Sequence, residues 1–302
     1  MPGHEEWSDR QESATVTVDG HELEVAYYDS ESGGASENAS GERREDAGES
    51  NDGKPPVVFV HGIPTWSFLW RDIAPEIAED RRVIAPDLLG YGNSAMADGF
   101  DRSIRAQEAM LEDLFDELGV ETFSLVAHDI GGGVALRYAS HSPDAVDQLV
   151  LSNAVCYDSW PVEFVSELGL PSTADLSDEE LDAKLDFAFA DGLYDDEGHE
   201  EFVAGMKAPW QSEAGKLSLS RNAVATNTNH TTELDYGAIT AETLLLWGGD
   251  DVLQPVSYAE RLEDDLQDAD LSVLDRAYHW VVEDRPEAYR DRLASFLSEG
   301  EP

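Results

Sequence analysis

The sequence predicts an α/β fold in which a mostly parallel sheet is covered by helices on both faces. Short apolar runs alternate with amphipathic stretches along most of the chain. Apolar strands separated by helices are typical of such a sheet, whose ligands bind beyond the carboxyl ends of the strands. Strands are expected at 57–60, 82–85, 123–127, 147–152, 243–247 and 270–274, and helices at 66–79, 102–118, 131–141, 256–267 and 286–298.

Three segments depart from this alternation. Residues 15–28 predict two strands joined at Asp19–Gly20, which is a strong hairpin signal. Residues 30–54 are rich in Ser, Gly, Glu and Asp, and predict a disordered acidic insertion. Residues 155–235 hold many aromatic side chains among helical segments and lack strand signals. We therefore expect a core formed by 1–154 and 236–302, with a helical cap at 155–235.

The charge is the most unusual feature of the composition. The net charge is −46, because 65 acidic residues face only 19 basic ones. The acidic residues are spread along the whole chain, which favours a surface suited to molar salt, where charges are screened over about 3 Å. A field that attracts cationic partners is the alternative. The charge therefore indicates the high-salt cytoplasm of a halophile rather than a particular reaction.

Several classes of protein are disfavoured by what the sequence lacks. Cys156 is the only cysteine, which excludes an intramolecular disulfide and a cysteine-based metal cluster. We find no signal peptide, no stretch long enough to span a bilayer, no glycine-rich phosphate loop and no basic patch. We expect a soluble cytoplasmic protein without metal or cofactor, whose partners are a small apolar organic substrate and water, not nucleic acid or membrane.

A strand-to-helix turn at 127–132 (AHDIGG) carries the strongest chemical signal. A sharp turn of this kind needs small residues two before its central residue and two and three after it, because the backbone passes close to itself. Serine hydrolases have Ser at the centre, and here the residue is Asp129. A carboxylate at the N-terminus of a helix is favoured in its ionised, nucleophilic form. A helix cap alone would explain Asp129 but not the three small residues.

A histidine and an acid follow in the order that such folds use, which is nucleophile, acid, histidine. A carboxylate nucleophile needs a general base that activates water against its covalent ester. His279 lies between the last predicted strand and the last predicted helix, and it is the only histidine after the candidate acid. The acid follows the strand at 243–247, where the residues alone leave both Asp250 and Asp251 open.

Four segments together resemble the haloalkane dehalogenase and epoxide hydrolase group of α/β-hydrolases. They are 61–71 (HGIPTWSFLWR), 87–94 (DLLGYGNS), 128–132 (HDIGG) and 279–287 (HWVVEDRPE). The resemblance extends over nearly the whole chain from about residue 15, except the 30–54 insertion, and weakens in the cap. It implies an α/β-hydrolase fold, with a helical cap and no cofactor.

The resemblance also implies roles for individual residues. Asp129 would displace a halide or open an epoxide, leaving an alkyl ester that His279-activated water cleaves. The family places the acid four residues before a proline, which favours Asp251 over Asp250 as the residue that orients His279. The backbone N–H groups of Ile63 and Ile130 would form the oxyanion hole, where each donor typically contributes a few kcal/mol.

Two departures from the family pattern concern the leaving group. Dehalogenases usually place Trp after the nucleophile and many place Asn after the His-Gly pair, whereas this chain has Ile130 and Ile63, which offer no side-chain donor. Residues that could contact the substrate instead, or simply pack in the core, are Trp66, Tyr157, Trp160, Trp210 and Asn222. Epoxide opening would need hydroxyl groups from the cap that stabilise the alkoxide as it forms. Tyr157, Tyr194 and Tyr236 are available for this role.

The leading functional hypothesis is therefore a dehalogenase-like hydrolase that works through an alkyl ester on Asp129. An epoxide hydrolase with the same triad is the first alternative, and a hydrolase of an activated ester or lactone is the second. A ligand-binding relative without turnover is the alternative that is not an enzyme, and the intact spacing of the triad argues against it.

Overall fold

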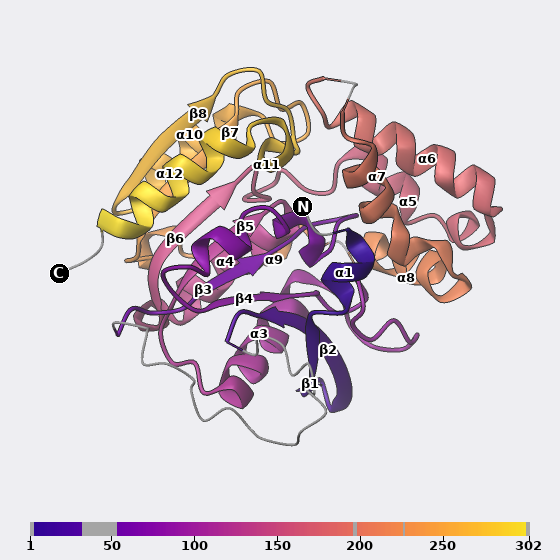
Figure 1. The fold of residues 1–302 in the computed structure, drawn as a ribbon, viewed down its shortest axis with the longest axis horizontal. Coiled ribbons are helices and arrows are strands. Elements are labelled where there is room, and N and C mark those ends of the chain that lie inside the picture. Colours follow the sequence, from indigo (N-terminus) through magenta and orange to yellow (C-terminus); the bar gives the residue numbers. More distant parts are fainter. Residues whose placement is uncertain (1–2, 32–52, 196–197, 226, 300–302) are drawn as a thin grey trace, which may run out of the picture.

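A single eight-stranded sheet forms the centre of the molecule (Figure 1). The computed structural model describes residues 3–31, 53–195, 198–225 and 227–299. The strands are β1 (Gln11–Val18), β2 (His21–Asp29), β3 (Val57–Val60), β4 (Val83–Pro86), β5 (Phe123–His128), β6 (Val146–Ser152), β7 (Glu242–Gly248) and β8 (Ala269–Leu274). Their order in the sheet is β1-β2-β4-β3-β5-β6-β7-β8, and only the β1–β2 and β2–β4 pairs are antiparallel.

The helices fall into two groups. Those of the core are α1 (His4–Ser8), α2 (Ala74–Ile77), α3 (Ile104–Leu118), α4 (Ile130–His141), α10 (Val256–Asp265), α11 (Val281–Asp284) and α12 (Pro286–Glu299). Between β6 and β7 come α5 (Glu163–Leu168), α6 (Asp178–Asp191), α7 (Glu200–Lys207), α8 (Glu213–Val224) and α9 (Asn229–Thr232). The 3-10 turns are η1 (Ser67–Trp70), η2 (Pro143–Ala145), η3 (Pro171–Asp175), η4 (Ala208–Gln211) and η5 (Tyr236–Ala238).

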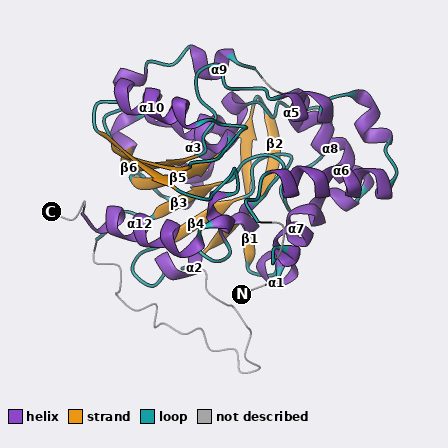
Figure 2. Ribbon diagram, turned by 90° about the horizontal axis from the view of Figure 1, so that it is seen from above, coloured by secondary structure: helices purple, strands orange, loops and turns teal. Residues whose placement is uncertain are grey.

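The layered α/β fold expected from the sequence is confirmed. Figure 2 shows α3 and α10 on one side of the sheet and α2 and α12 on the other. Every residue of β3, β4 and β5 is buried, since helices cover both faces of these central strands. The predicted hairpin is also present: Asp19 and Gly20 both have positive φ, as a tight two-residue turn between twisted strands requires.

The prediction of one continuous helix over 66–79 is wrong. The segment instead forms η1 and the short helix α2, separated by residues 71–73. Pro75 explains the break, because a proline has no N–H to donate and its ring clashes with the carbonyl group four residues earlier. Pro75 is tolerated where it stands, in the first turn of α2.

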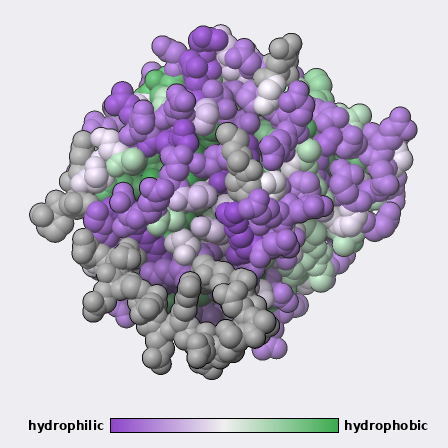
Figure 3. Space-filling view, viewed as in Figure 1, coloured by the Kyte–Doolittle hydropathy of each residue, from purple (hydrophilic) through white to green (hydrophobic). Residues whose placement is uncertain are grey.

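The segment between β6 and β7 is helical, as the sequence predicts. Figure 1 shows α5, α6, α7 and α8 gathered to one side of the sheet, and we propose that residues 155–235 form the cap. Most of the predicted acidic insertion, residues 32–52, lies outside the described residues. Hydrophilic residues cover most of the face seen in Figure 3. Among the described residues, no helix is long and apolar enough to cross a membrane.

Candidate active site

Asp129 occupies a sharp turn between β5 and α4. Its φ of 54° and ψ of −124° lie outside the helical and extended regions, a conformation that residues other than glycine rarely adopt and that is concentrated at functional sites. The side chain is only 4% exposed and makes no capping hydrogen bond to α4. The turn therefore holds an acid at the N-terminal, electropositive end of the helix without using it as a cap.

Glycines allow the backbone to pack closely around this turn. A Cβ added to Gly131 would collide with the carbonyl oxygens of Val60 and His61, and one added to Gly62 would collide with the Asp129 side chain. These contacts explain why the turn needs small residues. They also bring the loop that follows β3 against the carboxylate.

The carboxylate of Asp129 faces His279, which in turn faces Asp251. The Nε2 of His279 lies 3.5 Å from Oδ2 of Asp129, and its Nδ1 lies 2.9 Å from Oδ2 of Asp251. All three side chains are buried. Asp250, the alternative acid, is exposed. Three segments far apart in the sequence thus converge at the carboxyl ends of β5 and β7 and in the loop after β8, where the sequence predicts the chemistry.

The orientation of Asp251 is fixed by several donors. Its Oδ1 accepts hydrogen bonds from the backbone N–H groups of Leu253 (2.7 Å) and Gln254 (3.1 Å). Its Oδ2 accepts a hydrogen bond from the Asn153 side chain at 2.5 Å. Burial alone would raise the pKa of Asp251, but the charge of His279 and these hydrogen bonds outweigh it and lower the pKa.

The charge state of His279 follows from its two acidic neighbours. Burial alone would lower the pKa of this imidazole, but the carboxylates of Asp251 and Asp129 outweigh it and raise the pKa to about 10. In the free protein His279 is therefore a cation at neutral pH, held between two carboxylates.

Two further histidines near the site are structural and neutral. Burial lowers the pKa of His61 and of His128 to about 4. The Nε2 of His128 lies 2.8 Å from the backbone carbonyl oxygen of His279, and the Nε2 of His61 accepts the N–H of Leu88 at 2.9 Å. His128 thus holds the loop that carries His279.

The loop after β3 contributes a backbone donor. The N–H of Ile63 donates to Oδ1 of Asp129 at 2.8 Å. Ile130, expected to supply the second donor, is the first residue of α4, and its side chain is buried beside the turn. The Ile63 N–H is thus in place to stabilise charge on an oxygen bonded to the Asp129 carbon.

A cavity of about 70 Å³ opens beside Asp129 and His279. Its walls are mostly apolar and come from the core and from the segment between β6 and β7. The lining residues are Ile63, Pro64, Asp129, Trp160, Val162, Phe164, Val165, Phe187, Ala188, Asp191, Leu253, Gln254, His279 and Trp280. The described residues contain no group of three or more side chains suited to hold a metal ion.

Of the five residues suggested for substrate contact, only Trp160 lines this cavity. The Nε1 of Trp66 donates to Gly205, and the Nε1 of Trp210 donates to Pro64. Asn222 donates to the carbonyl of Gly90 at 2.7 Å. These three side chains join the helices between β6 and β7 to the core, because each buried polar group has found a backbone carbonyl there.

The tyrosines considered for epoxide opening are also engaged elsewhere. The hydroxyl of Tyr157 donates to Asp265 at 2.8 Å, and its ring stacks on Tyr236. The hydroxyl of Tyr236 donates to the carbonyl of Thr231 at 3.0 Å. Tyr194 packs edge-on against Tyr278. None of the three is among the residues that line the cavity.

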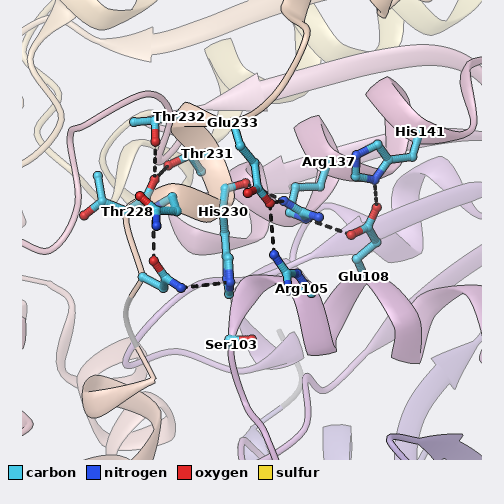
Figure 4. Close-up of polar contacts among 12 residues, drawn as sticks. Ser103, Arg105, Glu108, Arg137, His141, Thr228, His230, Thr231, Thr232 and Glu233 are labelled. Carbon is cyan, nitrogen blue, oxygen red and sulfur yellow. Dashed lines mark hydrogen bonds and ion pairs between the residues drawn. The ribbon is translucent and has the colours of Figure 1, made fainter.

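An ion-pair network centred on the buried Arg137–Glu108 pair anchors α4, the helix that follows Asp129 (Figure 4). Arg137 of α4 donates to Glu108 of α3 at 2.7 Å and to the carbonyl of His230 at 2.9 Å. It also donates to Glu233, directly after α9, at 2.8 Å. Glu108 accepts a second contact from His141 at 2.5 Å. The network holds α4 in place against α3 and against α9 and the residue that follows it.

Sequence reasoning missed Asn153, His128, Gln254 and Trp280 at this site. Asn153 and His128 each stand at the carboxyl end of a central strand. This position could have marked them as candidates for the site, because ligands of such sheets bind there. Gln254 and Trp280 gave no such signal beyond their closeness to Asp251 and His279.

Comparisons with known proteins agree with the fold. Residues 55–286 match a family model described as alpha/beta hydrolase fold. A 2-hydroxymuconate semialdehyde hydrolase of a Pseudomonas species is 30% identical over 268 residues, which cover 82% of this chain and 88% of the relative. Haloalkane dehalogenase 2 of Mycobacterium tuberculosis is 29% identical over 267 residues, which cover 81% and 87%.

Solved structures are similar over nearly the whole chain. An alpha/beta hydrolase fold protein from Burkholderia ambifaria has a TM-score of 0.79 at 25% identity, covering 93% of this chain and 97% of that one. A haloalkane dehalogenase from Bradyrhizobium elkani has a TM-score of 0.72 at 23% identity, covering 96% and 98%. At that identity the second similarity concerns the fold alone.

Proposed function

We propose that this chain, which belongs to the α/β-hydrolase fold family, is a haloalkane dehalogenase-like hydrolase that forms an alkyl ester on Asp129. The observation that carries this proposal is a carboxylate at the strained turn, with the imidazole Nε2 of His279 3.5 Å from its Oδ2. A carboxylate in this position can attack an alkyl carbon and be released again as a carboxylate by hydrolysis of the ester.

In the first step an oxygen of Asp129 attacks the carbon that bears the halogen. The new carbon–oxygen bond forms as the carbon–halogen bond breaks, and the halide leaves with the bonding electron pair. The cationic His279 and the N-terminus of α4 both lie beside the Asp129 carboxylate that makes this attack. The small, mostly apolar cavity suits a compact apolar substrate and excludes bulk water from the reacting atoms.

In the second step His279 activates the water that hydrolyses the ester. Once Asp129 is esterified it no longer carries the negative charge that helps to raise the pKa of His279. The imidazole can then lose its proton and act as a general base. Asp251 stabilises the imidazolium that forms, and the Ile63 N–H stabilises negative charge on the ester oxygen. The products are an alcohol, a halide ion and a proton.

The alternatives have less support from the site. Epoxide opening needs a donor for the alkoxide, and the three candidate tyrosines do not line the cavity. Hydrolysis of an activated ester or lactone, or of the kind of substrate named for the semialdehyde hydrolase relative, would not need a carboxylate at the turn. A binding protein without turnover would not need the ordered contacts around Asp251.

The test is to trap the ester. His279→Ala should accumulate it when incubated with 1-bromobutane in concentrated sulfate, which screens the charge without adding halide. Mass spectrometry should then find one butyl group on the peptide that contains Asp129. The matched control, Asp129→Asn/His279→Ala, should remain unmodified. The absence of any adduct with bromoalkanes or epoxides, together with wild-type hydrolysis of simple esters, would overturn the proposal.

A further inference from the structure

We propose that the side-chain amide of Gln254 binds the leaving halogen of the substrate. This inference rests on the proposed function, because only that reaction has a leaving halide. It assigns a binding role to a residue that sequence reasoning did not consider, and it follows from a buried side-chain amide that has no partner among the described residues.

Gln254 is a buried amide at the wall of the cavity. Its side chain is 1% exposed, and the residue lines the same cavity as Asp129 and His279. Its backbone is fixed at both ends: the N–H donates to Asp251 at 3.1 Å, and the carbonyl accepts the indole N–H of Trp247 at 2.7 Å. The side chain is therefore presented to the cavity from a rigid turn.

The side-chain amide of Gln254 is not satisfied by the protein. Its Oε1 is buried without any hydrogen-bond partner among the described residues, and no hydrogen bond of its Nε2 is found there either. Buried polar side chains nearly always find a partner, since an unpaired one destabilises the fold. An unpaired amide at the wall of an active-site cavity is therefore expected to have its partner in the substrate.

Trp280 lines the same cavity, but Gly192 covers the N–H edge of its indole ring. Its side chain is 2% exposed and its Nε1 has no hydrogen-bond partner among the described residues. Gly192 packs against this edge of the ring, where any Cβ would collide with Nε1. The rest of the wall near Asp129 includes Ile63, which has no side-chain donor. Gln254 thus remains the lining residue whose buried amide has no hydrogen-bond partner among the described residues.

The chemistry of the step identifies what these donors bind. As Asp129 forms its bond to carbon, the atom that gains negative charge is the departing halogen, which leaves with the electron pair. Donors that face this atom stabilise the transition state more than the ground state. Because the cavity is only about 70 Å³, a substrate that reaches Asp129 also contacts the other residues that line it, Gln254 among them.

The test measures how fast the Asp129 ester forms. Gln254→Met removes the amide at nearly constant volume, and it is placed in the His279→Ala background so that only alkylation by 1-bromobutane is followed. We expect the rate to fall at least tenfold. Gln254→Glu, which adds a carboxylate where the halide would form, should slow the reaction at least as much.

A second glutamine provides a matched control. Gln148 is also buried, but its amide donates to the carbonyl of Phe296 at 2.9 Å, near the amino end of β6 and away from the carboxyl end where the site lies. Gln148→Met should lower the thermal midpoint and leave the rate of ester formation within twofold. Gln254→Met should leave the thermal midpoint of the free protein unchanged or raised, because it removes a polar group that has no partner.

Each outcome decides between the two proposals. Slower ester formation with an undiminished thermal midpoint supports the role of Gln254. Ester formation at an unchanged rate in both Gln254 variants overturns this inference and leaves the proposed function standing. A Gln254→Met protein with a lowered midpoint and an unchanged rate assigns the amide a structural role. Absence of the ester already in His279→Ala overturns the proposed function, and this inference with it.

Discussion

Asn153 and His279 share one oxygen of Asp251. The Asn153 amide donates to Oδ2 of Asp251 at 2.5 Å, and the Nδ1 of His279 lies 2.9 Å from the same atom. The Oδ1 of Asn153 also accepts the N–H of Gly248 at 3.1 Å. Asn153, at the end of β6, therefore ties the acid to the end of β7, and Asp251 cannot turn away from His279 without breaking this contact.

Replacing Asn153 should affect the orientation of the triad rather than substrate binding. Asn153 has a φ of 44°, so Asn153→Gly keeps the backbone conformation while removing the amide. We expect kcat to fall about 10- to 100-fold, because a misplacement of a catalytic group by about 1 Å can cost about 10²-fold, with little change in KM. Steady-state kinetics checks this, with the exposed Asn229→Gly as the control. A change confined to KM would contradict the orienting role.

The charge of Asp129 should control the pKa of His279. Asp129 is one of the two carboxylates that raise this pKa to about 10 in the free protein. Asp129→Asn removes that charge at constant shape, so the pKa of His279 should fall while turnover is lost. NMR titration of the imidazole C–H signals measures the shift. An unchanged pKa would contradict the step in which esterification turns His279 into a base.

The stability of the free protein should depend on pH through His279. The pKa of His279 is about 10 in the folded protein and 6.5 for the free side chain, so folding favours the protonated form. This contribution is fully present below about pH 6.5 and is lost as the pH rises through about 10. Denaturant titrations at constant salt should show the free energy of unfolding decreasing over that range. His279→Gln should show a smaller decrease, and an equal decrease would contradict the assignment.

The turn at Asp129 could be predicted from sequence because its requirements are local. Small residues at fixed offsets reflect backbone contacts, and Gly131 makes the close approach to Val60 and His61 that those offsets imply. The strands were predictable for a similar reason, since buried parallel strands are apolar throughout. The neighbouring residues alone could not distinguish Asp250 from Asp251 as the acid. The choice depends on which side chain receives the backbone N–H groups of Leu253 and Gln254.

The lining of the cavity could not be predicted, because it depends on where each polar side chain finds a partner. Trp66 and Trp210 have their indole N–H groups bonded to Gly205 and Pro64, and they join the helices between β6 and β7 to the core. Trp280 has no such partner and lines the cavity. In the sequence these three tryptophans are equivalent. Only the positions of the backbone carbonyls around each ring distinguish them.

Arg137 should be far more important for stability than Arg105, although both arginines contact Glu233. The Arg137 side chain is buried with Glu108, so Arg137→Met would leave the buried carboxylate with only the half-exposed His141 beside it. We expect the free energy of unfolding to fall by about 3–5 kcal/mol. Arg105 is 58% exposed, and Arg105→Met should cost less than about 1 kcal/mol. Denaturant titration of both variants in the same salt measures the difference. Equal losses would mean that the network holds α4 through Glu233 rather than through the buried pair with Glu108.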